Sequence, residues 1–114
     1  MSRRFPEPGD IWETRLGWYN EVTSEWEYKK RPVLVLIVKS RKLIRICSMT
    51  SVKVGKNPPP GSISISKNSQ NGLSLDSHIL TYQLDTVSTS ELLRYFGDVD
   101  ESLLGKVLDS ANNF

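Results

Sequence analysis

The fold of this chain is decided by the stretch Lys29-Lys30-Arg31-Pro32-Val33-Leu34-Val35-Leu36-Ile37-Val38, where a basic cluster ends at a proline and an unbroken apolar run follows. Proline cannot donate to a sheet ladder, so Pro32 is expected at the first residue of a strand. The run after it predicts a central strand buried on both faces. Arg31 is then expected at the rim of a rigid sheet, where it can bind an anion. The alternative is that these charges only prevent aggregation of the apolar strand that follows them.

The composition is that of one small globular domain. The chain has 114 residues, of which 38% are hydrophobic and 25% charged, and we expect a single domain over residues 1–114. Its longest apolar run is too short to span a membrane, and its first residues lack the core of a signal peptide. With one cysteine (Cys47) and one histidine (His78), an internal disulfide and a zinc cluster are excluded. We therefore expect a cytoplasmic protein with no membrane association, no metal and no cofactor.

The charge is unevenly distributed along the chain. Residues 1–60 contain twelve Lys and Arg against six Asp and Glu, whereas residues 61–114 contain three against seven. The basic half suggests an anionic partner such as nucleic acid. The acidic half is interpreted as a solvated helical face or as a surface for a basic partner.

Most of the chain has the pattern of strands and turns. Residues 10–16 alternate as in a half-buried strand, and residues 17–30 are interpreted as a long connection. A four-residue turn joins the central strand to the next one, so the two are expected to be antiparallel neighbours. The predicted strands are residues 10–16, 32–38, 43–49, 62–66, 77–82 and 84–87, with a basic, proline-rich loop at 52–61.

Two helices are predicted at the end. Ser88-Thr89-Ser90-Glu91 has a capping pattern before an apolar run, and Gly97 is a suitable stop. Acidic residues from Asp98 onward then start a second helix with apolar positions on one face. The predicted fold class is therefore mainly β with a C-terminal helix, a small α+β barrel.

Hydroxyl groups cluster in Ser48-Met49-Thr50-Ser51, at the end of the third predicted strand. Such hydroxyls begin a turn or bind a phosphate oxygen, and by themselves they favour the turn. Because the two central strands should be antiparallel, however, Arg31 and Thr50 are expected at the same end of one hairpin. There they would be within reach of a common anion.

Other candidate residues have a structural and a functional interpretation. The aromatic residues of the 17–30 connection, which include Trp18 and Trp26, either pack the loop or stack on unpaired bases. Lys53 and Lys56 are either solvent-exposed residues of a loop or residues that bind along a phosphate backbone. His78 lies in an apolar strand pattern that favours a structural histidine, and Cys47 is expected in the core.

Five motifs in order resemble those of the MazF/PemK family of toxins. These are Gly9-Asp10-Ile11-Trp12, Lys30-Arg31-Pro32-Val33-Leu34-Val35-Leu36, Ser48-Met49-Thr50-Ser51, Gly72-Leu73-Ser74-Leu75-Asp76-Ser77 and Gln83-Leu84-Asp85-Thr86-Val87, followed by a Leu-rich helix. The resemblance implies an SH3-like barrel (CcdB/MazF-like), a homodimer and metal-independent cleavage of single-stranded RNA. It also implies a cognate antitoxin that blocks the groove.

The resemblance also implies roles for individual residues. Arg31 matches the catalytic arginine, Thr50 the phosphate-binding hydroxyl and Ser51 its small polar neighbour. The RNA-binding candidates, chosen for their charge or their aromatic faces and not from the resemblance, are Lys29, Lys30, Lys53, Lys56, Trp18 and Trp26. Two departures matter. Ser24-Glu25-Trp26-Glu27 replaces the usual Gly-x-Glu-Gln, so the assisting carboxylate is Glu27 or Glu25. Asp85 replaces the arginine of the usual Gln-x-Arg-Thr.

Two functions are therefore carried forward from the sequence. The first is a sequence-specific endoribonuclease in which the substrate 2′-hydroxyl attacks phosphorus and leaves 2′,3′-cyclic phosphate and 5′-hydroxyl ends. A planar guanidinium at Arg31 suits the anionic transition state. The second is a non-cleaving barrel that binds nucleic acid or, like the related CcdB toxins, a protein such as gyrase; Asp85 favours this alternative.

Overall fold

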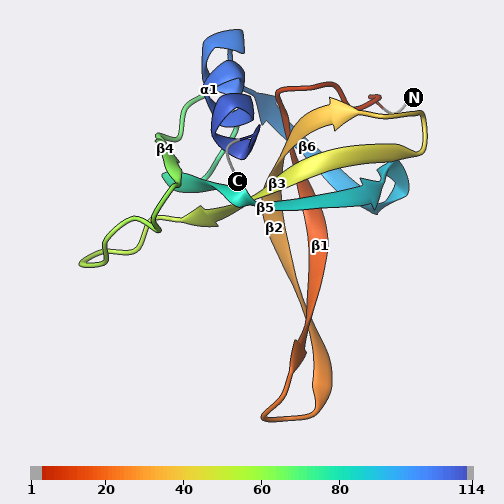
Figure 1. Ribbon diagram of the computed structural model, residues 1–114, viewed down its shortest axis with the longest axis vertical. Helices are drawn as coiled ribbons and strands as arrows, with labels where there is room; N and C mark the ends of the chain where they lie inside the picture. Colours follow the sequence, from red (N-terminus) through yellow and green to blue (C-terminus); the bar gives the residue numbers. More distant parts are fainter. Residues whose placement is uncertain (1–3, 113–114) are drawn as a thin grey trace.

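The chain folds into one curled antiparallel sheet with a single helix beside it (Figure 1). The computed structural model describes residues 4–112. Within this range the elements are β1 (Asp10–Asn20), β2 (Glu25–Val38), β3 (Leu43–Ser51), β4 (Ile63–Ile65), β5 (Ser77–Ser88), the 3₁₀ turn η1 (Thr89–Glu91), β6 (Leu92–Asp98) and α1 (Glu101–Asn112). The strand order in the sheet is β4-β5-β3-β2-β1-β6.

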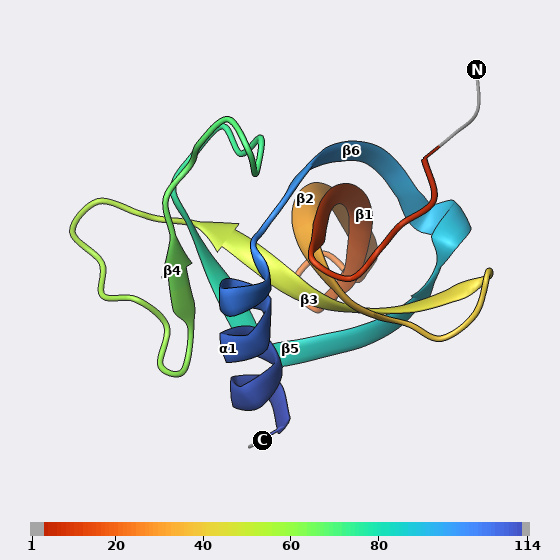
Figure 2. The same cartoon turned by 90° about the horizontal axis from the view of Figure 1, so that it is seen from above.

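β2 lies in the middle of the sheet, and its residues 33–36 are buried on both faces. Leu34 and Leu36 pack into the core cluster under the helix, whereas Val33 and Val35 pack into a second cluster with Trp12. Both faces are covered because the sheet curls, which brings β6 back near the end of β5, to which it is joined by η1 (Figure 2). The prediction of a central strand is thus confirmed, and its burial on both faces holds for residues 33–36, whereas Ile37 is exposed.

The C-terminal helix covers one side of the curled sheet. In α1, Val107 and Ala111 are buried, and Val107 belongs to the same core cluster as Leu34 and Leu36. The second predicted helix is confirmed, as is the fold class of a mainly β chain with a C-terminal helix. Among the described residues, no helix has both the length and the apolar character needed to cross a membrane.

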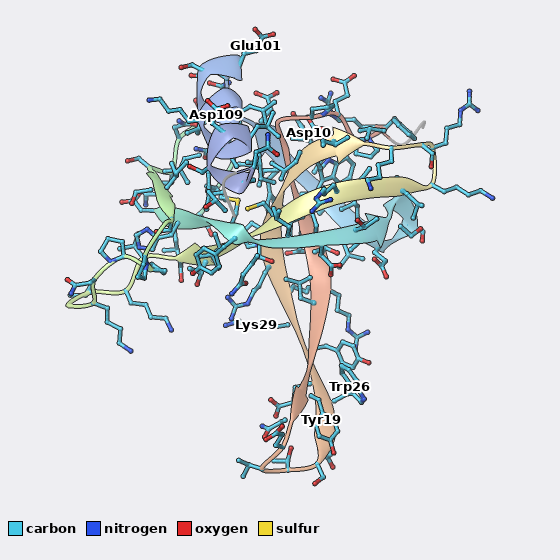
Figure 3. The ribbon with its side chains drawn as sticks, in the orientation of Figure 1. Asp10, Tyr19, Trp26, Lys29, Glu101 and Asp109 are labelled. Atoms are coloured by element: carbon cyan, nitrogen blue, oxygen red, sulfur yellow. The ribbon has the colours of Figure 1, made fainter. Side chains whose placement is uncertain are left out.

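The predicted connection over residues 17–30 is wrong, because these residues extend β1 and β2 into a long two-stranded arm (Figure 3). Cross-strand pairs stabilise the arm. The rings of Tyr19 and Trp26 pack edge to face, with their centres 5.8 Å apart. The Arg15 guanidinium lies 4.3 Å from the centre of the Tyr28 ring. Gly17 leaves room for that ring, since a Cβ there would lie 2.7 Å from it. The alternation in Glu25-Trp26-Glu27-Tyr28-Lys29 is typical of a strand, but these aromatic residues were interpreted as part of a connection.

Two strand boundaries also differ from the prediction. Pro32 is inside β2 and not at its first residue, because β2 continues toward the arm while paired only with β1. Pairing with β3 begins at Val33, so the missing N–H of Pro32 is tolerated where one ladder begins. The strands predicted at 77–82 and 84–87 are one strand, β5, interrupted by a bulge.

The helix predicted after Ser88 is wrong. The Ser88 hydroxyl does cap a turn by accepting from the Ser90 N–H at 3.3 Å, but only the short η1 follows. The next residues form β6, in which Tyr95 pairs with Trp12 of β1. Gly97 is a strand residue packed against the backbone of Gln70 and Asn71, where a Cβ would clash. Pairing with β1 and burial of Leu92 therefore override the local helical pattern.

Candidate active site

The hairpin of β2 and β3 brings Arg31 and Thr50 together. The two residues flank the start of the β2–β3 ladder, and the Arg31 Nη1 donates to the Thr50 Oγ1 at 3.4 Å. This is a long hydrogen bond, and none of the ion pairs found among residues 4–112 involves Arg31. Arg31 is half-buried, so its position is constrained while N–H donors remain for an anion. The predicted meeting of the two residues is confirmed.

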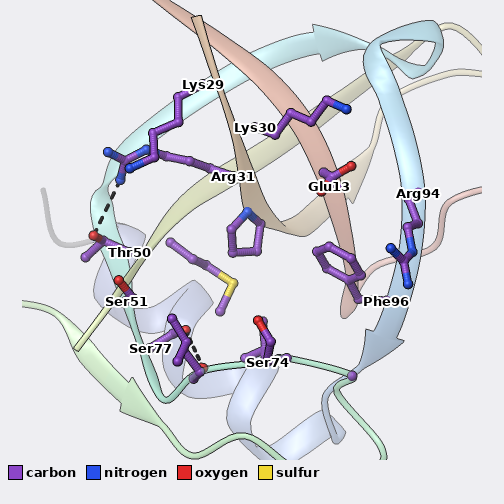
Figure 4. A pocket seen from close by; sticks show the side chains of 15 residues that line it. Glu13, Lys29, Lys30, Arg31, Thr50, Ser51, Ser74, Ser77, Arg94 and Phe96 are labelled. Carbon is purple, nitrogen blue, oxygen red and sulfur yellow. Dashed lines mark hydrogen bonds between the residues drawn. The ribbon is translucent and has the colours of Figure 1, made fainter. Parts of the chain in front are cut away.

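These residues line a groove with a volume of about 480 Å³ (Figure 4). Arg31 and Lys29 project toward Thr50 on one side, and Arg94 lies across from them on β6. The lining includes four cationic side chains and four hydroxyls, with one carboxylate: Lys29, Lys30, Arg31, Arg94, Thr50, Ser51, Ser74, Ser77 and Glu13. This excess of cations and hydroxyl donors suits a phosphodiester.

The carboxylate in the groove is Glu13, which the sequence analysis did not select. Glu27 is four residues before Arg31 on β2, a distance of roughly 13 Å at about 3.3 Å per residue, and it pairs with Trp18 on the arm. Glu25 lies still farther out. Glu13 and Arg94 are cross-strand partners. Arg94 was missed because its segment was interpreted as a helix.

The RNA-binding candidates fall into three places. Lys29 and Lys30 line the groove. Lys53 and Lys56 line a smaller cavity of about 160 Å³, which also includes Thr50 and Ser51. Trp26 is 63% exposed on the arm, and the side chain of Trp18 lies outside what the structure describes. The lysines therefore adjoin the Arg31–Thr50 pair, whereas Trp26 does not.

His78 and Cys47 are buried side chains with hydrogen-bond partners. The Nδ1 of His78 lies 3.1 Å from the Ser64 hydroxyl. The Cys47 thiol donates to the Leu80 carbonyl oxygen at 2.8 Å, and burial raises the pKa of this thiol to about 12. The expectation that Cys47 belongs to the core is confirmed.

The fold and the groove together define a class: a small curled β-barrel with a C-terminal helix and a cationic surface groove. The particular family is given by a family model described as PemK-like, MazF-like toxin of type II toxin-antitoxin system, which matches residues 7–114. The chain belongs to this family of toxins, and the resemblance drawn from its five motifs is confirmed. No curated protein matches it in sequence.

Solved structures share the fold at low sequence identity. An endoribonuclease from a mycobacterial species, in complex with its cognate antitoxin, superposes with a TM-score of 0.68 and 16% identity over 95% of this chain and 92% of that one. The Mycobacterium tuberculosis toxin MazF-mt6 superposes with a TM-score of 0.65 and 18% identity, over 91% of this chain and 93% of that one. A MazE-MazF structure from Deinococcus radiodurans superposes with a TM-score of 0.64 and 14% identity, over 97% of this chain and 95% of that one.

Proposed function

We propose that this toxin cleaves single-stranded RNA in the groove, without a metal ion or cofactor. The observation that supports this best is the Arg31–Thr50 pair, whose donors converge in a groove rich in cations. Similar folds in proteins described as endoribonucleases agree with the proposal. The groove is open to a flexible single strand, whose phosphates can follow the lysines beside Thr50.

In the proposed reaction the substrate supplies its own nucleophile. The ribose 2′-oxygen forms a bond to the adjacent phosphorus and loses its proton, while the bond from phosphorus to the 5′-oxygen breaks and that oxygen gains a proton. The products are a 2′,3′-cyclic phosphate and a 5′-hydroxyl. The Arg31 guanidinium stabilises the additional negative charge on the non-bridging oxygens, with the Thr50 and Ser51 hydroxyls as further donors.

The proton acceptor in this scheme is a carboxylate. The sequence suggested Glu27 or Glu25, but Glu13 is the carboxylate among the described residues that line the groove. We therefore assign the proton acceptor to Glu13. Replacing Glu13 by Gln should slow cleavage more than replacing Glu27 by Gln, because Glu13 lines the groove whereas Glu27 lies on the arm.

The deciding experiment is incubation of the pure protein with a long single-stranded RNA, followed by mapping of the fragment ends. We expect discrete fragments with 2′,3′-cyclic phosphate ends, in the presence of EDTA as in its absence. A 2′-deoxy substitution at the cut should abolish cleavage. Arg41→Ala is a matched control for Arg31→Ala, because Arg41 is exposed in the β2–β3 turn. Cleavage of the deoxy substrate, or by Arg31→Ala, contradicts this mechanism.

The family assignment also supports two proposed partners. The first is a cognate antitoxin whose acidic segment occupies the cationic groove; its co-expression should relieve growth arrest caused by this chain. The second is another copy of the chain, which light scattering should reveal as a particle of about twice the 12.9 kDa of one chain. A clean monomer at micromolar concentration would contradict the dimer.

The alternative function is a barrel that binds nucleic acid or a protein without cleaving. Asp85 is the observation that favours it, because a carboxylate here replaces the usual cation of the family motif. Intact RNA after prolonged incubation, together with retained RNA binding, would support this alternative over cleavage.

A further inference from the structure

A second hollow adjoins the Arg31–Thr50 pair. It has a volume of about 660 Å³, and it shares Arg31, Met49 and Thr50 with the groove. A phosphate bound at Arg31 and Thr50 therefore touches both hollows. The two nucleotides that this phosphate joins then have one hollow each.

A bulge in β5 shapes the second hollow. Leu84 pairs with Cys47 and Ile79 pairs with Met49, so residues 80–83 stand opposite the single residue Ser48 of β3. Bulges of this kind redirect side chains and are frequent beside functional sites. Here the bulge places Tyr82 on the wall of the hollow, with Leu16 and Pro59 as further walls. These surfaces suit the flat face of a base.

Asp85 provides the acidic group of this hollow. It is exposed, it lines the hollow, and it takes part in none of the ion pairs among the described residues. Its Oδ1 accepts from the backbone N–H of Thr86 at 2.8 Å, which fixes the orientation of the carboxylate. Each carboxylate oxygen has two lone pairs, so both oxygens can still accept from a ligand. A carboxylate repels phosphate and therefore selects N–H donors here.

Among the four bases, guanine fits such a carboxylate best. Its N1–H and N2–H₂ donors are adjacent and parallel on the Watson–Crick edge, so the two carboxylate oxygens can accept both. Adenine and cytosine present one amino group beside an acceptor, and uracil presents one N–H between two carbonyls. We propose that the second hollow binds a guanine next to the cleaved phosphodiester and that Asp85 determines this specificity. The inference rests on the proposed function and names its substrate class.

Binding without cleavage tests this site directly. Deoxyuridine oligonucleotides lack the 2′-hydroxyl, so the proposed chemistry cannot cut them. One guanine in such an oligonucleotide should tighten binding, and inosine, which lacks the N2 amino group, should lose on the order of tenfold of that gain. Asp85→Asn should bind the guanine and inosine forms equally, because the amide has one acceptor. Asp109→Asn, with the same charge change on the exposed face of α1, should keep the preference.

Cleavage products provide the second test. Sequenced fragment ends should show guanine at one fixed position next to the cut, and Asp85→Asn should relax this position alone. Guanine-selective binding without RNA cleavage by the parent protein would refute the proposed function and keep the guanine site. Equal binding of guanine and inosine by the parent, or an unchanged preference in Asp85→Asn, would overturn the guanine site even if RNA is cut.

Discussion

The two halves of β2 differ in what determines their structure. Residues 32–38 pair with β1 and β3 and are mostly buried, whereas residues 25–31 pair with β1 alone and form one side of the arm. In the first half, burial on two faces requires an apolar run. In the second, cross-strand contacts such as Tyr19 with Trp26 replace burial. Arg31 lies at the boundary, so its backbone is anchored while its guanidinium reaches the groove.

The comparison predicts the largest loss of stability in the buried half. Leu34 is fully buried in the core cluster, so Leu34→Ala should lower the free energy of unfolding by about 2–5 kcal/mol. Val22, which is 94% exposed at the tip of the arm, is the matched control: Val22→Ala should change it by less than about 0.5 kcal/mol. Chemical denaturation of both variants gives the two values. Equal losses would mean that the two halves are not distinct.

The same contrast explains how much the sequence could predict. The apolar run from Val33 to Val38 predicted a buried central strand. Because a short turn joins it to the next strand, the proximity of Arg31 to Thr50 followed as well. The β2 side of the arm does carry a strand pattern, because Glu25-Trp26-Glu27-Tyr28-Lys29 alternates charged and aromatic residues. The pairing of Tyr19 with Trp26 becomes visible only in the fold. Glu13 was missed for a related reason: the groove is complete only when β6 pairs with β1, and the capping pattern at Ser88 pointed to a helix instead.

The next largest effect is expected at Arg31, on the boundary between the two halves of β2, and it concerns activity and not stability. Arg31→Lys keeps the charge but loses the two-pronged geometry, so the cleavage rate should fall by about tenfold to a thousandfold. Thr50→Val removes one hydroxyl at nearly constant shape and should cost less than Arg31→Ala. Rates come from a fluorescent RNA under single-turnover conditions. Arg41→Lys should match the parent; if Arg31→Lys also matches it, Arg31 supplies only charge.

A smaller effect is expected at the end of the arm. If Trp26 stacks on an unpaired base, Trp26→Ala should weaken RNA binding by about 1 kcal/mol, or roughly fivefold, at the low end for such stacking. Stability should fall by no more than about 0.2–1 kcal/mol, the contribution of the cross-strand pair with Tyr19, because the side chain is mostly exposed. Trp26→Phe keeps an aromatic face and should recover most of the affinity. Unchanged affinity in Trp26→Ala would assign this ring to packing with Tyr19 alone.

The smallest expected effect is that of a thiol reagent on Cys47, which should hardly react in the folded protein. Cys47 pairs with Leu34 in the buried sheet, and burial raises the pKa of its thiol to about 12. Because the thiolate is the reactive form, a maleimide or disulfide reagent at pH 8 should leave native Cys47 unmodified. A cysteine introduced at the tip of the arm by Val22→Cys should react within minutes under the same conditions. In denaturant both thiols should react alike, since the pKa of Cys47 then returns toward that of an exposed thiol. Rapid modification of Cys47 in the folded protein would show that the buried half of the sheet opens as readily as the arm, and the contrast between the two halves of β2 would then not hold.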